Sequence, residues 1–130
     1  MPHRNINLTE AEWSVMECLW EDSPRTGREV TNYLEEKEGW SRSTTLTLLS
    51  RLEAKGAVSS DSEGSKKTFR PILRRDDAAL HETKDFLSRV YHGSVSMLVS
   101  SLTKKQALSK TEIDQLHAIL DAMEGGREDD

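Results

Sequence analysis

Apolar residues in the first half of the chain follow the helical repeat in three successive segments. Thr9 with Glu12, and Thr26 with Glu29, form S/T-x-x-E capping boxes that open the first two segments. We therefore predict helices within residues 9–22, 26–39 and 41–55. The helically spaced residues predicted to be buried are Trp13, Met16, Trp20, Val30, Tyr33, Leu34, Thr45, Leu48, Leu49 and Leu52.

The pattern changes after Gly56, where short alternating segments replace the helical repeat. Residues 57–60 and 66–70 read as two strands, residues 61–65 as the turn between them, and Pro71 limits the second strand. Three helices followed by a hairpin predict a mainly α fold, a winged helix-turn-helix over residues 1–75. In that fold the third helix enters the major groove of DNA and the hairpin lies over the adjacent backbone.

Residues 76–124 have only helical patterns. We predict a helix from about Asp76 to His92, a break at Gly93, a short helical segment, a last helix opened by a Ser109–Glu112 capping box, and a frayed tail at 125–130. Short amphipathic helices bury little apolar surface alone, so we expect this segment to form a helical dimerisation domain of a homodimer. Folding back on residues 1–75 in a monomer is the alternative. The predicted dimerisation residues are Leu80, Leu87, Val90, Tyr91, Leu98, Leu102, Ile113, Leu116 and Leu120.

The outward face of the third predicted helix combines arginines with small hydroxyl side chains and has no carboxylate before Glu53. A plain solvated helix usually alternates Glu and Lys, whereas short hydroxyls and arginines suit close approach to bases and phosphates. Leu46 could contact a thymine methyl group or extend the buried stripe, and the pattern favours neither. The predicted DNA-binding residues are Arg42, Ser43, Thr44, Leu46, Thr47, Ser50 and Arg51 on the helix, with Lys66 and Lys67 in the hairpin.

Charge is distributed unevenly along the 130 residues, whose net charge is −5. Residues 40–75 carry eight basic and three acidic side chains, a local charge of +5, while the segments on either side are each at −5. A DNA backbone responds to the local face of a protein, so we expect a double-stranded DNA partner. Chance drift of charge in a window of this length is the alternative.

Several other functions lack their sequence signals. No apolar run approaches the ~18 residues that a membrane span needs, the first ten residues are polar, and Cys18 is the only cysteine, so we expect a cytoplasmic protein without disulfides. The four histidines lack metal-ligand spacing, which predicts no metal and no cofactor. A Gly-rich phosphate loop and a nucleophile elbow are absent, so an enzyme is not expected.

Particular segments resemble the BlaI/MecI/CopY family of penicillinase-type repressors. They are Leu8–Met16, Trp20, Trp40–Ser41, Thr44, Thr47–Leu48, Arg51–Leu52, Lys55–Gly56, Phe86, Arg89–Tyr91, Gly93, Leu108–Ser109, Glu112–Ile113 and Leu116. The resemblance implies a homodimeric winged-helix repressor that binds a dyad operator and blocks transcription. It also implies that Thr44, Thr47 and Arg51 face DNA. Ser43 and Leu46 stand where several relatives carry longer side chains, which implies a different operator or weaker binding.

The resemblance also bears on how repression ends. Family members that respond to β-lactams are cut at an Asn-Phe bond by a membrane sensor metalloprotease, and the corresponding bond here is Ser101–Leu102. The copper-responsive branch carries paired cysteines that this chain lacks, so thiolate copper sensing is not expected. A winged-helix protein-interaction module without direct DNA readout remains the alternative function.

Overall fold

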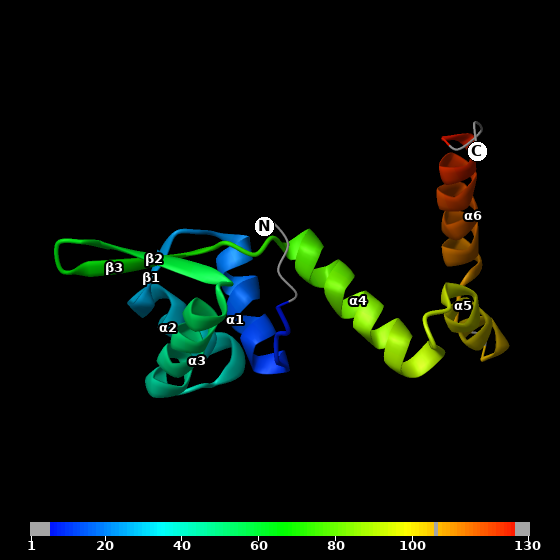
Figure 1. Ribbon diagram of the computed structural model, residues 1–130. Helices are drawn as coiled ribbons and strands as arrows, with labels where there is room; N and C mark the ends of the chain where they lie inside the picture. The colour runs from blue at the N-terminus through cyan, green and yellow to red at the C-terminus, as the bar shows by residue number, and fades with distance from the viewer. Residues whose placement is uncertain (1–5, 106, 127–130) are drawn as a thin grey trace. The chain divides into compact units, whose positions relative to one another are not determined.

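The computed structural model describes residues 6–105 and 107–126 of the chain (Figure 1). Residues up to Thr83 form one compact unit and residues from Lys84 form a second, so the helix α4 contributes to both. The elements in chain order are α1 (Glu10–Glu21), β1 (Arg25–Thr26), α2 (Gly27–Glu38), α3 (Arg42–Lys55), β2 (Val58–Glu63), β3 (Lys66–Pro71), α4 (Arg75–Tyr91), α5 (Val95–Lys104) and α6 (Lys110–Gly125).

The helix boundaries follow from local capping. Both predicted capping boxes of the first unit form, with the Thr9 and Thr26 hydroxyls accepting from the amides of Glu12 and Glu29. Ser41 caps α3 by accepting from the Thr44 amide. Gly39 (φ 74°) and Gly56 (φ 84°) end α2 and α3 in the left-handed conformation that costs glycine least.

The core of the first unit lies where α1, α2 and α3 meet the sheet. Its buried residues are Val15, Met16, Cys18, Leu19, Val30, Leu34, Leu48, Leu49, Leu52, Ala57, Val58 and Phe69. The predicted stripes on α2 and α3 account for most of these positions. The tryptophans differ from the prediction, because Trp13 and Trp20 are only half-buried and pack edge to face at 5.2 Å.

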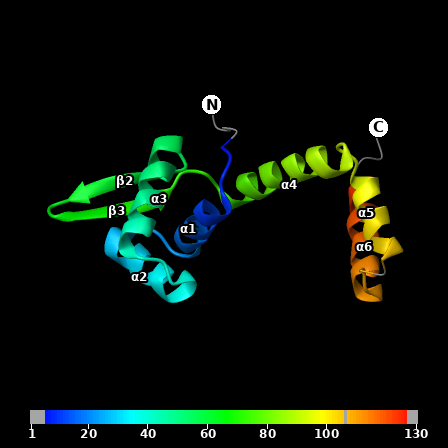
Figure 2. The same cartoon turned by 90° about the horizontal axis from the view of Figure 1, so that it is seen from below.

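The sheet is antiparallel in the order β1-β3-β2 (Figure 2). Its hairpin is longer than predicted: β2 continues to Glu63, so only Gly64 and Ser65 form the turn, with Gly64 at φ 63°. The polar residues 61–63 suggested a turn, but pairing with β3 keeps them extended. The two-residue strand β1 was not predicted, because pairing of Arg25 with Phe69 leaves no local signal. These features give the predicted mainly α, winged helix-turn-helix fold.

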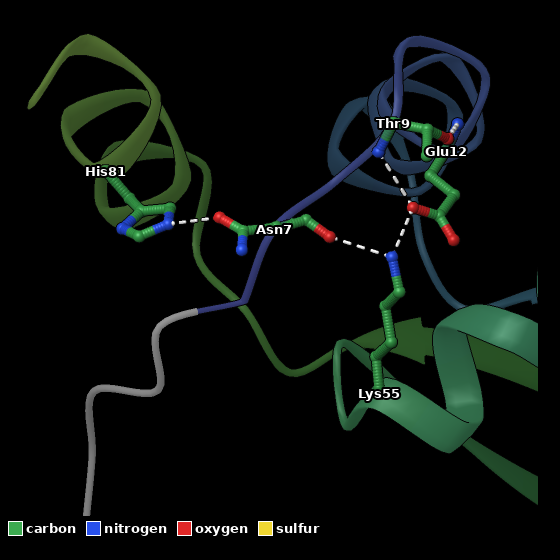
Figure 3. A network of polar contacts seen from close by, with 5 residues as sticks. All are labelled: Asn7, Thr9, Glu12, Lys55 and His81. Atoms are coloured by element: carbon green, nitrogen blue, oxygen red, sulfur yellow. Dashed lines mark hydrogen bonds and ion pairs between the residues drawn. The ribbon is translucent and has the colours of Figure 1, made fainter. Parts of the chain in front are cut away.

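A buried ion pair holds the end of α3 against the start of α1 (Figure 3). The Glu12 side chain is buried, and its Oε1 accepts from Lys55 Nζ at 2.6 Å and from the Thr9 amide at 2.8 Å. The Asn7 carbonyl accepts a second bond from Lys55 at 2.8 Å, while Asn7 Oδ1 lies 2.8 Å from His81 Nε2 on α4. One network therefore fixes both ends of the α1–α3 contact.

A second group of contacts fixes the first turn of α4 to α1. The Arg75 guanidinium donates two bonds to Glu17, at 3.0 and 2.9 Å, and lies over the rings of Trp13 and Trp20. Trp20 Nε1 donates to the Leu73 carbonyl at 2.9 Å. The helix begins one residue before the predicted start.

The second unit holds the rest of α4, then α5 and α6. The helix α4 ends at Tyr91, one residue before the predicted end, because His92 (φ 54°) and Gly93 (φ 84°) are left-handed. The predicted Ser109–Glu112 capping box opens α6, which continues to Gly125. The last four residues of the predicted tail lie outside the described residues. In the described ranges no helix combines the length and apolar character needed to cross a bilayer.

Candidate nucleic-acid interface

One face of α3 is open to solvent and carries the predicted reading residues. Arg42, Ser43, Thr44, Thr47, Ser50 and Arg51 are all exposed, while Thr45, Leu48, Leu49 and Leu52 on the opposite face are buried. At the helix start, Ser41 Oγ donates to Thr44 Oγ1 at 3.0 Å. Short hydroxyls and two guanidinium groups thus project from a firmly packed helix, which leaves room for base edges and phosphates.

The wing presents the two predicted lysines on β3. Lys66 and Lys67 are exposed, and they pair in the hairpin with Glu63 and Ser62 of β2. Lys67 Nζ lies 5.4 Å from the ring centre of Phe69 and 3.9 Å from Glu53 Oε1. Farther along, Arg70 forms an ion pair with Asp61 across the two strands. The cations of β3 are therefore partly balanced by carboxylates before any partner binds.

An open groove of about 660 Å³ separates α3 from the wing and from the start of α2. Its lining residues are Thr26, Gly27, Arg28, Glu29, Arg42, Leu46, Leu49, Ser50, Glu53, Ser65, Lys66, Lys67 and Phe69. Four of these are cations and two are carboxylates. Glu29 belongs to the α2 capping box, where the bond from the Thr26 amide holds the pKa of Glu29 below its ordinary value. Glu53 is the second carboxylate of the groove.

Leu46 occupies the floor of this groove. It is half-buried and packs against the core, and a Cβ added at Gly27 would lie 3.7 Å from Leu46 Cδ2. Part of its surface therefore belongs to the α2–α3 contact, and the remainder lines the groove. Both interpretations of Leu46 made from the sequence have a physical basis in this position.

The predicted dimerisation residues differ in exposure. Leu80, Val90, Ile113 and Leu120 are exposed, and Tyr91, Leu98, Leu102 and Leu116 are half-buried. Leu87 is already buried within the chain. Neither α5 nor α6 has a buried residue among its described positions. The apolar stripes of the second unit thus remain largely uncovered in a single chain.

The sequence prediction missed several exposed apolar residues of the second unit. Met97 and Ile119 are 47% and 62% exposed, although neither was named as a dimerisation residue. Ile119 follows Leu116 by three residues and precedes Met123 by four, so the helical repeat contained its signal. Arg28 was also missed, because its place in the groove depends on the packing of α2 beside the wing.

The Ser101–Leu102 bond lies inside α5. Both residues are half-buried, and the carbonyl of Leu102 accepts from the Ala107 amide at 2.9 Å. A protease binds its substrate in an extended form, so α5 must open locally before this bond can be cut.

The remaining candidate chemistry is limited. Burial raises the pKa of the Cys18 thiol to about 11, which leaves it protonated and unreactive near neutral pH. Among the described residues, no three His, Cys, Asp or Glu side chains converge as a metal site would require.

Comparison with known proteins identifies relatives over nearly the whole chain. The family model described as penicillinase repressor matches residues 8–122. A penicillinase repressor of Bacillus licheniformis is 32% identical over 114 residues, which cover 88% of this chain and 89% of that protein. The methicillin resistance regulatory protein MecI of Staphylococcus aureus (strain N315) is 27% identical over 120 residues, 92% of this chain and 98% of its own.

A solved structure matches the first unit. It is the solution structure of the Bacillus licheniformis BlaI monomeric form in complex with the blaP half-operator. The similarity has a TM-score of 0.51 at 31% identity, covering 57% of this chain and 90% of that one.

Proposed function

The chain belongs to the penicillinase repressor family of DNA-binding transcriptional repressors, and we propose that it binds a dyad operator as a homodimer with α3 in the major groove. Because the family consists of transcriptional repressors, the chain is not an enzyme. The observation that carries the proposal is the exposed face of α3, with two arginines, four hydroxyls and no carboxylate before Glu53. The half-operator complex of BlaI supports one winged-helix unit per half-site.

The proposed roles of the interface residues divide between bases and backbone. Arg42, Thr44, Thr47 and Arg51 are placed on α3 to reach base edges, with Ser43 and Ser50 close enough for phosphate or sugar. Leu46 offers an apolar contact at the groove floor. Lys66 and Lys67 lie on the wing, where a phosphate backbone beside the major groove would pass.

Fluorescence anisotropy with labelled fragments of the chain's own promoter region tests this assignment. We expect R51A to weaken operator binding by about 1–3 kcal/mol, roughly ten- to a hundredfold, with little effect on unrelated DNA. K66A should weaken binding to all sequences and reduce the slope of log K against log salt by about 0.9. K110A changes an exposed lysine of α6 and is the matched control. A wild-type protein that binds no site with sequence preference would favour the protein-interaction module instead.

The homodimer is proposed from the uncovered apolar stripes of the second unit. Ile119, Leu120 and Met123 are each more than half exposed on α6, and Val95 is 59% exposed on α5. A second copy is the most economical cover for such stripes, since two-fold dimers are the commonest soluble assembly. Sedimentation should show a dimer for the wild type, a monomer for L120D, and a dimer for the control T111D, which changes an exposed polar residue of the same helix.

Release by proteolysis at Ser101–Leu102 completes the proposal. Cutting this bond would separate α4 from Ile113, Leu116 and Leu120 on α6, and a dimer that depends on them would dissociate. A membrane sensor metalloprotease is the proposed partner. Co-expression with such a protease, followed by intact-mass measurement, should give fragments of residues 1–101 and 102–130, and an uncut chain would exclude this route.

A further inference from the structure

Glu53 stands apart from the other residues of the α3 face, because it is the carboxylate of α3 that lines the groove. It lies in the last turn of the helix, and its side chain is 40% exposed. Its two oxygens contact both strands of the wing. Oε2 accepts from the Ser60 hydroxyl of β2 at 2.6 Å, and Oε1 lies 3.9 Å from Lys67 Nζ of β3.

Stability does not account for an acidic residue at this position. A carboxylate in the last turn faces the negative end of the helix dipole, which is unfavourable for α3. Half-exposed ion pairs such as Glu53–Lys67 contribute little to folding, since water screens them. The hydrogen bond from Ser60 does not require a charge, because an amide oxygen would accept it equally well.

The carboxylate has a larger consequence for a polyanionic ligand. It partly neutralises Lys67, one of four cations that line the groove. A phosphate that approaches Lys67 must compete with Glu53 for the ammonium group, and it is also repelled by the carboxylate, which Ser60 holds in place. Glu29, the other carboxylate of the groove, is engaged by the amide of Thr26 in a capping box and lies on α2.

We propose that Glu53 limits the affinity of this interface for the DNA backbone by competing with phosphate for Lys67. The inference rests on the proposed DNA-binding function and adds a residue that weakens binding. Backbone contacts supply nearly all of the affinity for unrelated DNA. A carboxylate in the groove therefore keeps nonspecific binding low, so that contacts from α3 to the bases decide where the protein stays.

The variant E53Q tests the proposal, because it removes the charge and keeps an acceptor for Ser60. Binding to operator and to unrelated DNA is measured by anisotropy at several salt concentrations. We expect E53Q to bind both DNAs more tightly, up to about eightfold near 0.1 M salt, with the slope of log K against log salt steeper by up to about 0.9. In a K67Q background the same change should produce little gain, because the released ammonium group is then missing.

E36Q is the matched control, since it makes the same change in net charge at an exposed position of α2 outside the groove. An E53Q protein with wild-type affinity and slope would overturn the proposal. An equal gain in E36Q or in the K67Q background would also overturn it, because repulsion by overall charge would then suffice. A wild-type protein without salt-dependent DNA binding would instead refute the proposed function itself.

Discussion

Replacing Lys55 by methionine should destabilise the first unit strongly and reverse the pH dependence of one buried group. K55M keeps much of the apolar stem of the side chain but removes the charge that lies 2.6 Å from Glu12 Oε1. The Glu12 side chain is only 2% exposed, whereas that of Lys55 is 35% exposed. The substitution therefore leaves the more deeply buried partner unpaired, which is the costlier half of the pair to strand.

The expected loss follows from the burial of the two partners. Removing one member of a fully buried ion pair costs about 3–5 kcal/mol. Here the lysine end reaches solvent and the Thr9 amide still donates to Glu12 at 2.8 Å, so we expect about 2–3 kcal/mol at neutral pH, at or below the low end of that range. K37M removes an exposed lysine from the last turn of α2 and should change stability by less than about 0.5 kcal/mol.

The pH dependence gives a second, independent readout. Burial by itself raises the pKa of Glu12, but the bonds from Lys55 and Thr9 and the lysine charge outweigh it, and the net pKa lies below the ordinary 4.5. In the wild type this contribution is present above about pH 4.5 and is lost as the pH falls through the folded-state pKa. Without Lys55, we expect burial to raise the pKa of Glu12 above its unfolded value, so that K55M is relatively more stable in acid.

Urea unfolding followed by tryptophan fluorescence, at one protein concentration and at about pH 7 and pH 4.5, measures both effects. The deficit of K55M relative to the wild type should shrink at the lower pH. A deficit below about 0.5 kcal/mol at pH 7, or one that grows in acid, would refute the reasoning.

Three further substitutions or modifications test separate parts of the first unit. Thr45 Oγ1 is buried without a hydrogen-bond partner, so T45V should raise the stability by up to about 1 kcal/mol and leave operator affinity unchanged; a loss of stability would point to an unrecognised partner. W20F removes the bond to the Leu73 carbonyl and should cost about 1–2 kcal/mol in urea unfolding, and a neutral result would contradict the importance of that contact. Because the pKa of Cys18 is about 11 and the thiol is buried, a thiol reagent at pH 8 should label only unfolded protein, and fast labelling of native protein would contradict its position in the core.

Much of the first unit was predictable because its signals are local. Thr9, Thr26 and Ser41 cap their helices within three residues, and the stripe from Thr45 to Leu52 repeats at helical spacing. The glycines at 39 and 56 end helices through their own backbone conformation. The family resemblance, which the comparisons confirm, added the function that these local signals allow but do not specify.

The unpredicted features depend on residues far apart in the chain. Glu12 was recognised as a capping residue, but its ion pair with Lys55 joins positions 43 residues apart. The strand β1 forms only because β3 returns beside Arg25 and Thr26. Glu53 appeared in the sequence as the end of a carboxylate-free face, and its contacts with Ser60 and Lys67 arise from folding of the wing against α3.

Dimethyl sulfate footprinting of the promoter fragment tests the central claim most directly, because the reagent modifies guanine N7 in the major groove. A homodimer that inserts α3 of each copy should protect two patches centred about 10 base pairs apart on one face of the duplex, and R51A should lose both. A single patch, protection confined to the minor groove, or no protection at concentrations that saturate binding would contradict the account.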